Sequence, residues 1–119
     1  MMGIDMQGAP MAVDLDVIQR EQLAWMLHNF PDATVNQAVL GVCEEAGELA
    51  HAQLKFEQGI RGDKGDHEAE ARDAVGDICI YLFHWCNLMG FQLFDIIRET
   101  WDQVKQRDWQ KFPGNGRDS

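Results

Sequence analysis

The sequence is poor in basic residues. Only 10 Lys and Arg oppose 20 Asp and Glu, so the formal net charge of the 119-residue chain is −10. Binding to nucleic-acid phosphates or to anionic lipid needs clustered Lys and Arg. We therefore expect neither a nucleic acid nor a membrane surface as a partner. Acidic residues in such excess suit divalent cations instead.

Cysteine is scarce as well, and no CxxC pair is present among Cys43, Cys79 and Cys86. This argues against a disulfide framework and against a structural zinc site. We expect all three to be small buried side chains in a reducing cytoplasm. The chain does not open with a basic segment and an apolar core, and no apolar run approaches the roughly 20 residues of a membrane span. The sequence predicts a soluble, cytoplasmic protein.

The apolar residues recur at helical spacing, and no strand pattern competes with it. Proline and glycine divide the chain into four predicted helices, at about 14–30, 34–58, 67–89 and 93–109. We expect one all-α domain over residues 1–119, a four-helix bundle with an antiparallel central pair. Residues 1–12 are expected to form a loose arm and residues 113–119 a flexible tail.

The second predicted helix contains the segment EEAGE at 44–48. At about 100° per residue, Glu44, Glu48 and His51 share one face, and Glu45 lies at its edge. Apolar residues cover most of the remaining circumference, so we expect this helix to be largely buried and the acidic stripe to face a cleft. The alternative is a solvated acidic face supported by Lys55.

The third predicted helix repeats the pattern, with Glu70, Asp73 and Asp77 on one face of an otherwise apolar segment. Helices joined by a short loop pack antiparallel, which would bring the two acidic stripes together. Carboxylates so close need a cation, and all-oxygen ligands favour Mg²⁺ or Mn²⁺. The loop itself, GIRGDKGD, lacks the GK[ST] ending of a P-loop.

EEAGE followed by DAVGDICIYL resembles the MazG-type all-α nucleoside triphosphate pyrophosphohydrolases, whose signature is EExxE, a spacer and then ExxD. The phrases GVCEEAGELAHAQLKFEQGIRG and VKQRDWQKFP are similar to a small single-domain phage or bacterial branch. The resemblance covers roughly residues 15–112. It implies a MazG-like bundle and hydrolysis of a (deoxy)nucleoside triphosphate between the α- and β-phosphates, with Mg²⁺ as the cofactor.

The resemblance also implies site residues. Glu45, Glu48 and Asp77 match metal ligands of the family, and Glu44 matches the leading glutamate of the pair. The family usually has glutamate at the position of Ala74, so we expect Asp73 to supply the fourth ligand. Glu70 is the alternative candidate for this fourth ligand. If Asp73 is the ligand, we expect Glu70 to be a structural partner of a nearby base such as Lys55. We assign catalytic roles to Glu44, Glu45 and Lys55.

The base would be bound at the end of the first helix, by Trp25, His28 and Asn29, where Asn29 could read base edges. Packing of Trp25 and Phe30 in the core is the favoured alternative for these two rings. The remaining candidate phosphate contacts are the basic side chains of Lys55, Arg61, Lys64 and Lys105, and a plain surface charge is the favoured alternative for each of them. We expect His51 and His84 to make hydrogen bonds, either between helices or to the metal ligands, in place of a catalytic role.

Two helices that are apolar almost all round cannot be covered by two short ones. We therefore expect a homodimer or a dimer of dimers, with Trp101, Lys105 and Trp109 as an intersubunit line on the last helix. Two other functions stay open. Glu48-Leu49-Ala50-His51 matches the Glu-x-x-His of carboxylate-bridged di-iron bundles, although no second copy follows. The second open function is that of a non-catalytic helical interaction protein.

Overall fold

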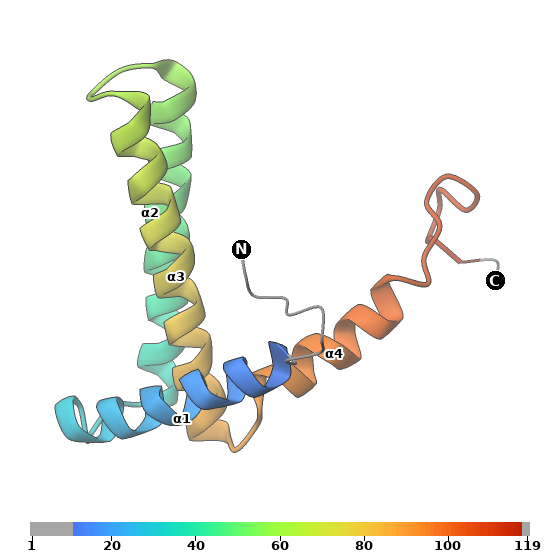
Figure 1. Ribbon diagram of the computed structural model, residues 1–119. Coiled ribbons are helices and arrows are strands. Elements are labelled where there is room, and N and C mark those ends of the chain that lie inside the picture. The colour runs from blue at the N-terminus through green and yellow to red at the C-terminus, as the bar shows by residue number, and fades with distance from the viewer. Residues whose placement is uncertain (1–10, 118–119) are drawn as a thin grey trace.

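The structure is a computed structural model that describes residues 11–117, and in this range it is entirely helical (Figure 1). Its four α-helices are α1 (Met11–Asn29), α2 (Val35–Gln58), α3 (Lys64–Met89) and α4 (Leu93–Val104). The all-α prediction is confirmed. No single helix in the described part is long and apolar enough to cross a membrane, and α3 with α4 reaches that composition only as a pair bent by 105°.

Helices α2 and α3 pack side by side as an antiparallel hairpin (Figure 1). Thr34 begins α2 with a capping box, in which its side chain accepts from the Gln37 N–H and the Gln37 side chain accepts from the Thr34 N–H. Gly59 ends α2 at φ 68°, a left-handed conformation that glycine adopts without strain. Asp63 then caps α3 by accepting from the Asp66 N–H at 2.8 Å.

Several predicted boundaries need correction. Helix α1 already begins at Met11, so the arm expected over 1–12 is at least two residues too long, and residues 1–10 lie outside the described range. Helix α3 begins at Lys64 rather than His67, because Asp63 caps it. Helix α4 ends at Val104 instead of Trp109.

The early end of α4 has a local cause. The carboxylate of Asp108 accepts from the backbone N–H groups of Gln110 and Lys111, which starts a new turn in place of a helix. The chain then folds back, since the Asp108 N–H donates to the Gly116 carbonyl at 2.9 Å. The expected tail is therefore a set of hydrogen-bonded turns as far as residue 117, and Trp109 does not continue the line of Trp101 and Lys105 along α4.

Small side chains and one carboxylate form the α2 side of the hairpin seam. The buried residues of α2 are Ala38, Gly41, Glu45 and Ala52. At Gly41 the backbone approaches α3 so closely that a Cβ atom would overlap the ring of Tyr81. The large apolar side chains consequently point away from the seam. The expectation that both helices are largely buried is wrong for one protomer, where the exposed apolar residues of the hairpin include Val39, Leu40, Leu54, Val75 and Ile80.

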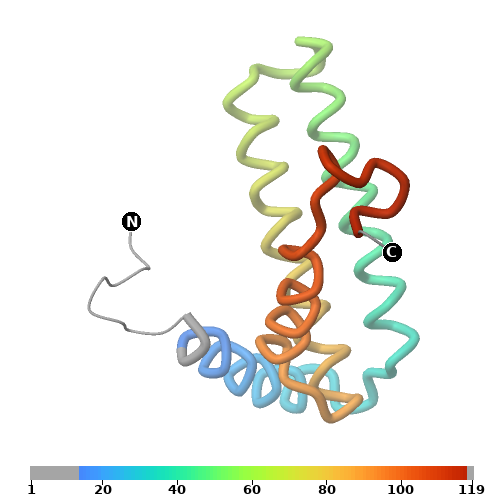
Figure 2. Tube along the Cα trace, turned by 90° about the vertical axis from the view of Figure 1, so that its right-hand side faces the viewer, coloured from blue at the N-terminus to red at the C-terminus, as the bar shows by residue number. Residues whose placement is uncertain are grey.

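Helix α1 crosses the end of the hairpin where α3 turns into α4, as both views show (Figures 1 and 2). Phe83, Cys86 and Leu93 form a small buried cluster there, packed against Leu15 and Ile96. Within the described residues, the backbone of α2 does not come close to that of α1 or α4. The four helices of one protomer therefore do not close into the expected bundle. The radius of gyration, 17.7 Å, exceeds the roughly 13.5 Å of a compact chain of this length.

The cysteines depart from the prediction in the same way. Cys86 is buried in the cluster at the base of the hairpin, but Cys43 and Cys79 are exposed, and all three are free thiols. Cys43 and Cys79 lie on the outward faces of α2 and α3, which the seam does not cover.

Candidate functional site

Two of the clefts along the hairpin seam divide the predicted carboxylates between them. The first, here called the α1 pocket, has a volume of about 460 Å³ and contains Glu45 and Asp77. The second, the acidic cleft, has a volume of about 490 Å³ and is lined by Glu44, Gly47, Glu48, His51, Glu70 and Asp73. The two acidic stripes thus meet at the seam, as the antiparallel packing of α2 and α3 predicted.

Glu45 is the buried member of this group, with 8% of its surface exposed. The pKa of its carboxyl is raised to about 7, first by burial and then by the hydrogen bond and charge of Glu48 and by the charge of Asp77. Its Oε2 atom is buried and makes no hydrogen bond within the described part of the chain. A buried acceptor without a donor is unfavourable, and a cation at this position would remove the deficit.

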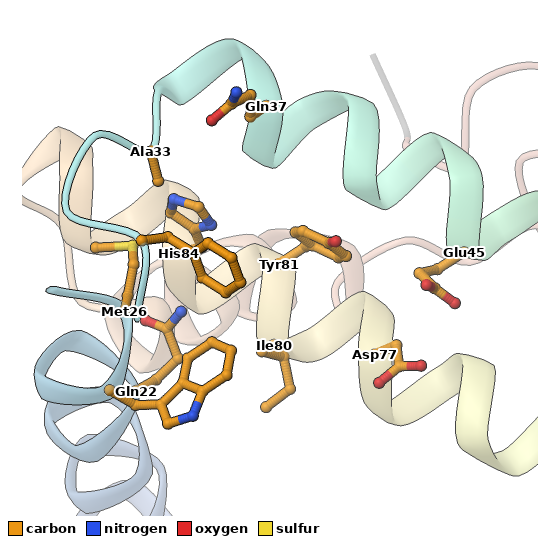
Figure 3. A pocket seen from close by; sticks show the side chains of 11 residues that line it. Gln22, Met26, Ala33, Gln37, Glu45, Asp77, Ile80, Tyr81 and His84 are labelled. Atoms are coloured by element: carbon orange, nitrogen blue, oxygen red, sulfur yellow. The ribbon is translucent and has the colours of Figure 1, made fainter. Parts of the chain in front are cut away.

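Asp77 lies across the seam from Glu45, and Figure 3 shows both carboxyl groups at one end of the α1 pocket. Burial raises the pKa of Asp77 above its usual value, followed by the charges of Asp73 and Glu48. The two helices therefore hold like charges against each other at a partly desolvated position. No lysine or arginine side chain lines either cleft.

The carboxylates fit a hard divalent cation by their chemistry, since each offers only oxygen ligands. The buried Oε2 of Glu45 is a ligand atom that lacks a partner. Within residues 11–117, however, no group of three or more His, Cys, Asp or Glu side chains is arranged so that it could hold a metal ion as it stands. Glu48 already lies against Glu45, and Asp73 against Asp77, so these two carboxylates are the ones that would complete a shell.

The other end of the α1 pocket is aromatic. Trp25 and Phe30 line it with their rings 5.6 Å apart in an edge-on arrangement, and their exposed fractions are 53% and 57%. The expectation that these two rings pack in the core is therefore wrong. From α3, Tyr81 and His84 stack with ring centres 6.4 Å apart. The pocket thus runs from two carboxylates to a group of planar side chains (Figure 3).

His84 does not make the expected interhelical hydrogen bond, because its buried Nε2 is without a partner among the described residues. Burial lowers the pKa of its imidazole, so the ring is held in its neutral form. The sequence also drew no attention to Gln22 and Gln37, which line this end of the pocket from α1 and α2. Apolar and polar residues are spread round α1 without a clear apolar face, so the sequence carried no signal that Gln22 points inward.

The remaining predicted substrate contacts lie outside both clefts. His28 and Asn29 are exposed at the end of α1, where the Asn29 amide donates to the Trp25 carbonyl. Lys55 donates to Gln58 at 2.9 Å, and Lys105 pairs with Asp102 at 3.2 Å.

Arg61 lies in the loop between α2 and α3, at the opposite end of the hairpin from α1 (Figure 1). One protomer does not bring it, or the other basic candidates, to the α1 pocket. Their roles stay predictions.

Glu70 faces His67 and not Lys55, but the Nδ1 atom of His67 has no hydrogen-bond partner in the described part of the chain, so the role of Glu70 stays a prediction. The Nδ1 of His67 lies 3.4 Å from the Glu70 carboxylate, and its Nε2 lies 2.8 Å from the Ile60 carbonyl. His67 is buried and thereby fastens the loop to α3. No ion pair is found for Asp73 within residues 11–117, which leaves its carboxylate available to a cation.

Comparison of the chain with protein-family models, with curated proteins and with solved structures found no match.

Proposed function

We propose that this protein is a nucleoside triphosphate pyrophosphohydrolase, which adds water across the α–β phosphoanhydride and releases a nucleoside monophosphate and pyrophosphate. One observation carries the proposal. A single pocket has two carboxylates of the MazG-like motif, Glu45 and Asp77, at one end and planar side chains, including Trp25, at the other. A nucleotide has the matching polarity, with phosphates that need a cation and a base that stacks on rings.

Glu45, Glu48, Asp73 and Asp77 would hold Mg²⁺, for which Mn²⁺ can substitute. The cation would neutralise phosphate oxygens and allow a polyanion to approach a protein with a net charge of −10. The raised pKa of Glu45 and Asp77 supports this assignment, because both carboxyls lack a compensating positive charge. Asp73 takes the place of the glutamate missing at Ala74, since Ala74 is buried in the seam and has no ligand atom.

The chain's own residues would act on water and on phosphate. Glu44 lies beside the proposed ligands in the acidic cleft, where its carboxylate would orient the attacking water and accept its proton. Lys55 lies about one turn beyond His51 along α2 and would contact the phosphate tail. We place this activity in the cytoplasm, where Cys43, Cys79 and Cys86 would stay reduced.

We further propose that the active form is a homodimer or a dimer of dimers. Apolar side chains that one protomer leaves exposed follow the hairpin and the free face of α4, where Ile97, Trp101 and Val104 are 39–52% exposed. Soluble monomers rarely expose so much contiguous apolar surface. A second copy that covers this surface would complete the bundle. Light scattering at micromolar concentration tests the proposal, and a monomer would refute it.

Pyrophosphate release from a panel of ribo- and deoxynucleoside triphosphates, with Mg²⁺, with Mn²⁺ and with EDTA, tests the activity. We expect metal-dependent turnover that falls by several orders of magnitude in Glu45→Gln and Asp77→Asn. Glu57→Gln is the matched control, because Glu57 is an exposed carboxylate on α2 outside both clefts. Inertness with every nucleotide would refute the proposal and favour a non-catalytic interaction protein. Iron-dependent absorbance would favour the di-iron alternative.

A further inference from the structure

A partly buried chain of amides joins α1, α3 and the start of α4 near the aromatic end of the α1 pocket. Gln19 is 2% exposed, and its Oε1 accepts from the backbone N–H of Leu93 at 2.9 Å. Its Nε2 donates to the Phe91 carbonyl at 2.8 Å and to Oδ1 of Asn87 at 2.9 Å. Backbone groups have fixed roles, so the Leu93 N–H and the Phe91 carbonyl determine which end of the Gln19 amide is oxygen and which is nitrogen.

The same reasoning extends along the chain to Gln22. Because Asn87 presents its oxygen to Gln19, its Nδ2 faces the other way and donates to the Gln19 carbonyl at 3.1 Å and to Oε1 of Gln22 at 2.7 Å. The oxygen of Gln22 is thereby committed to Asn87. The Gln22 NH₂ group must then be the end that remains, and it makes no hydrogen bond within residues 11–117.

Gln22 is 7% exposed and lines the α1 pocket. Figure 3 shows its amide extending from α1 toward the side of the pocket where His84 lies. His84 is 8% exposed, neutral, and has a buried Nε2 without a partner. A neutral imidazole nitrogen can donate or accept, depending on the tautomer. The Gln22 amide has no such freedom, so this end of the pocket offers one buried donor whose orientation the fold has fixed.

We propose that Gln22 is a specificity-determining residue of this pocket, and that it selects nucleobases which present a carbonyl oxygen over bases which present an exocyclic amino group. The inference rests on the proposed function, since it takes the pocket to be the base site. A carbonyl oxygen accepts from the Gln22 NH₂ group, whereas an amino group would set donor against donor and leave both without a partner. A pocket built to hydrogen-bond one group discriminates strongly against an analogue that lacks it.

Two matched pairs of substrates isolate this contrast. Inosine triphosphate has a carbonyl oxygen where adenosine triphosphate has an amino group, and uridine triphosphate differs from cytidine triphosphate in the same way. Within each pair the only other difference is the protonation of the neighbouring ring nitrogen. We expect kcat/KM to favour the carbonyl member by about ten- to a hundredfold in at least one pair. Equal kcat/KM values within both pairs would overturn the inference, although turnover itself would leave the proposed function intact.

The variant Gln22→Glu keeps an oxygen that accepts from Asn87 and replaces the donor by a second acceptor. We expect it to abolish or reverse the preference within the pair. Gln22→Met, which removes the donor without burying a charge, should abolish it, and a thermal melt shows whether each variant is folded. A preference that survives in a folded Gln22→Met protein would overturn the inference.

Gln37→Glu is the matched control, because it makes the same change of charge at the exposed rim of the same pocket. Glutamate preserves the capping box, since its oxygen still accepts from the Thr34 N–H. Gln37→Glu should change kcat/KM equally for both substrates of a pair and leave the ratio of the two kcat/KM values unchanged. A ratio that changes as much as in Gln22→Glu would attribute the effect to charge and refute the role of Gln22.

Binding of the four nucleosides, measured by isothermal titration calorimetry, separates the two proposals. Nucleosides carry no phosphate, so their affinity does not depend on the carboxylates. The proposed function fails if no triphosphate is hydrolysed. The specificity of the pocket still stands in that case if inosine or uridine binds more tightly than its amino counterpart and this difference disappears in Gln22→Met. If no nucleoside binds to the wild-type protein at millimolar concentration, the specificity inference fails.

Discussion

Gly41→Ala is the substitution whose effect the structure defines best. Gly41 lies inside α2, where a Cβ atom would overlap three atoms of the Tyr81 ring on α3. Tyr81 lines the α1 pocket and stacks on His84, so its ring cannot move without changing the pocket. Gly47 is a second glycine in the same helix, but a Cβ atom there would have nothing within 4 Å. Gly47→Ala is therefore the matched control.

The two variants share one energy term and differ in another. Replacing glycine by alanine in a helix interior stabilises by about 0.5–1 kcal/mol, and this gain is common to both. Forcing an extra methyl group into a packed contact costs about 1–3 kcal/mol, which applies only to Gly41. We therefore expect Gly47→Ala to be about 0.5–1 kcal/mol more stable than the wild type. Gly41→Ala should be about 1–3 kcal/mol less stable than Gly47→Ala.

Urea unfolding followed by circular dichroism measures both free energies of unfolding. At about 4 °C per kcal/mol for a chain of this length, the melting temperatures of the two variants should differ by about 4–12 °C. We also expect Gly41→Ala to weaken nucleoside binding, since the Tyr81 ring must leave its position. Equal stabilisation by both substitutions would show that α2 and α3 do not approach each other closely at Gly41, and the description of the seam would then be wrong.

Four further predictions concern the carboxylates. Asp73→Asn should lower activity and weaken Mg²⁺ dependence strongly while Glu70→Gln changes little, and the reverse ranking in a Mg²⁺ titration would make Glu70 the replacement ligand. The pKa of Glu45 is raised from 4.5 to about 7, so between these pH values the folded state keeps a proton that the unfolded chain releases. The free energy of unfolding of the metal-free protein should therefore fall as the pH rises from about 4.5 to 7, and it should stay constant above pH 7. Glu45→Gln should flatten this slope and raise the melting temperature at pH 8 without metal, even though it abolishes turnover. Ala74→Glu should destabilise the metal-free protein by more than about 2 kcal/mol in urea unfolding, since Ala74 is 1% exposed in the seam, and Mg²⁺ should restore part of the loss.

Local sequence was sufficient for the helices and for several of their ends. Thr34 and Gly59 bound α2 by side-chain and backbone hydrogen bonds that need no distant partner, so their sequence signals were reliable. The end of α4 was missed because Asp108 competes for the backbone amides of the next turn, a signal that helical periodicity alone does not include. The acidic stripes were likewise readable, since helical geometry fixes which residues share a face.

Tertiary structure alone decided how these faces are used. Periodicity places Glu45 near Glu48, but only the approach of α2 and α3 across Gly41 buries Glu45 and turns it toward Asp77, while Glu48 stays in the acidic cleft. It likewise takes a contact between residues some 70 positions apart to fix which end of the Gln22 amide faces the pocket. A sequence determines which side chains share a helix face, because that geometry is local. Which atoms those side chains meet depends on the packing of helices that are distant along the chain.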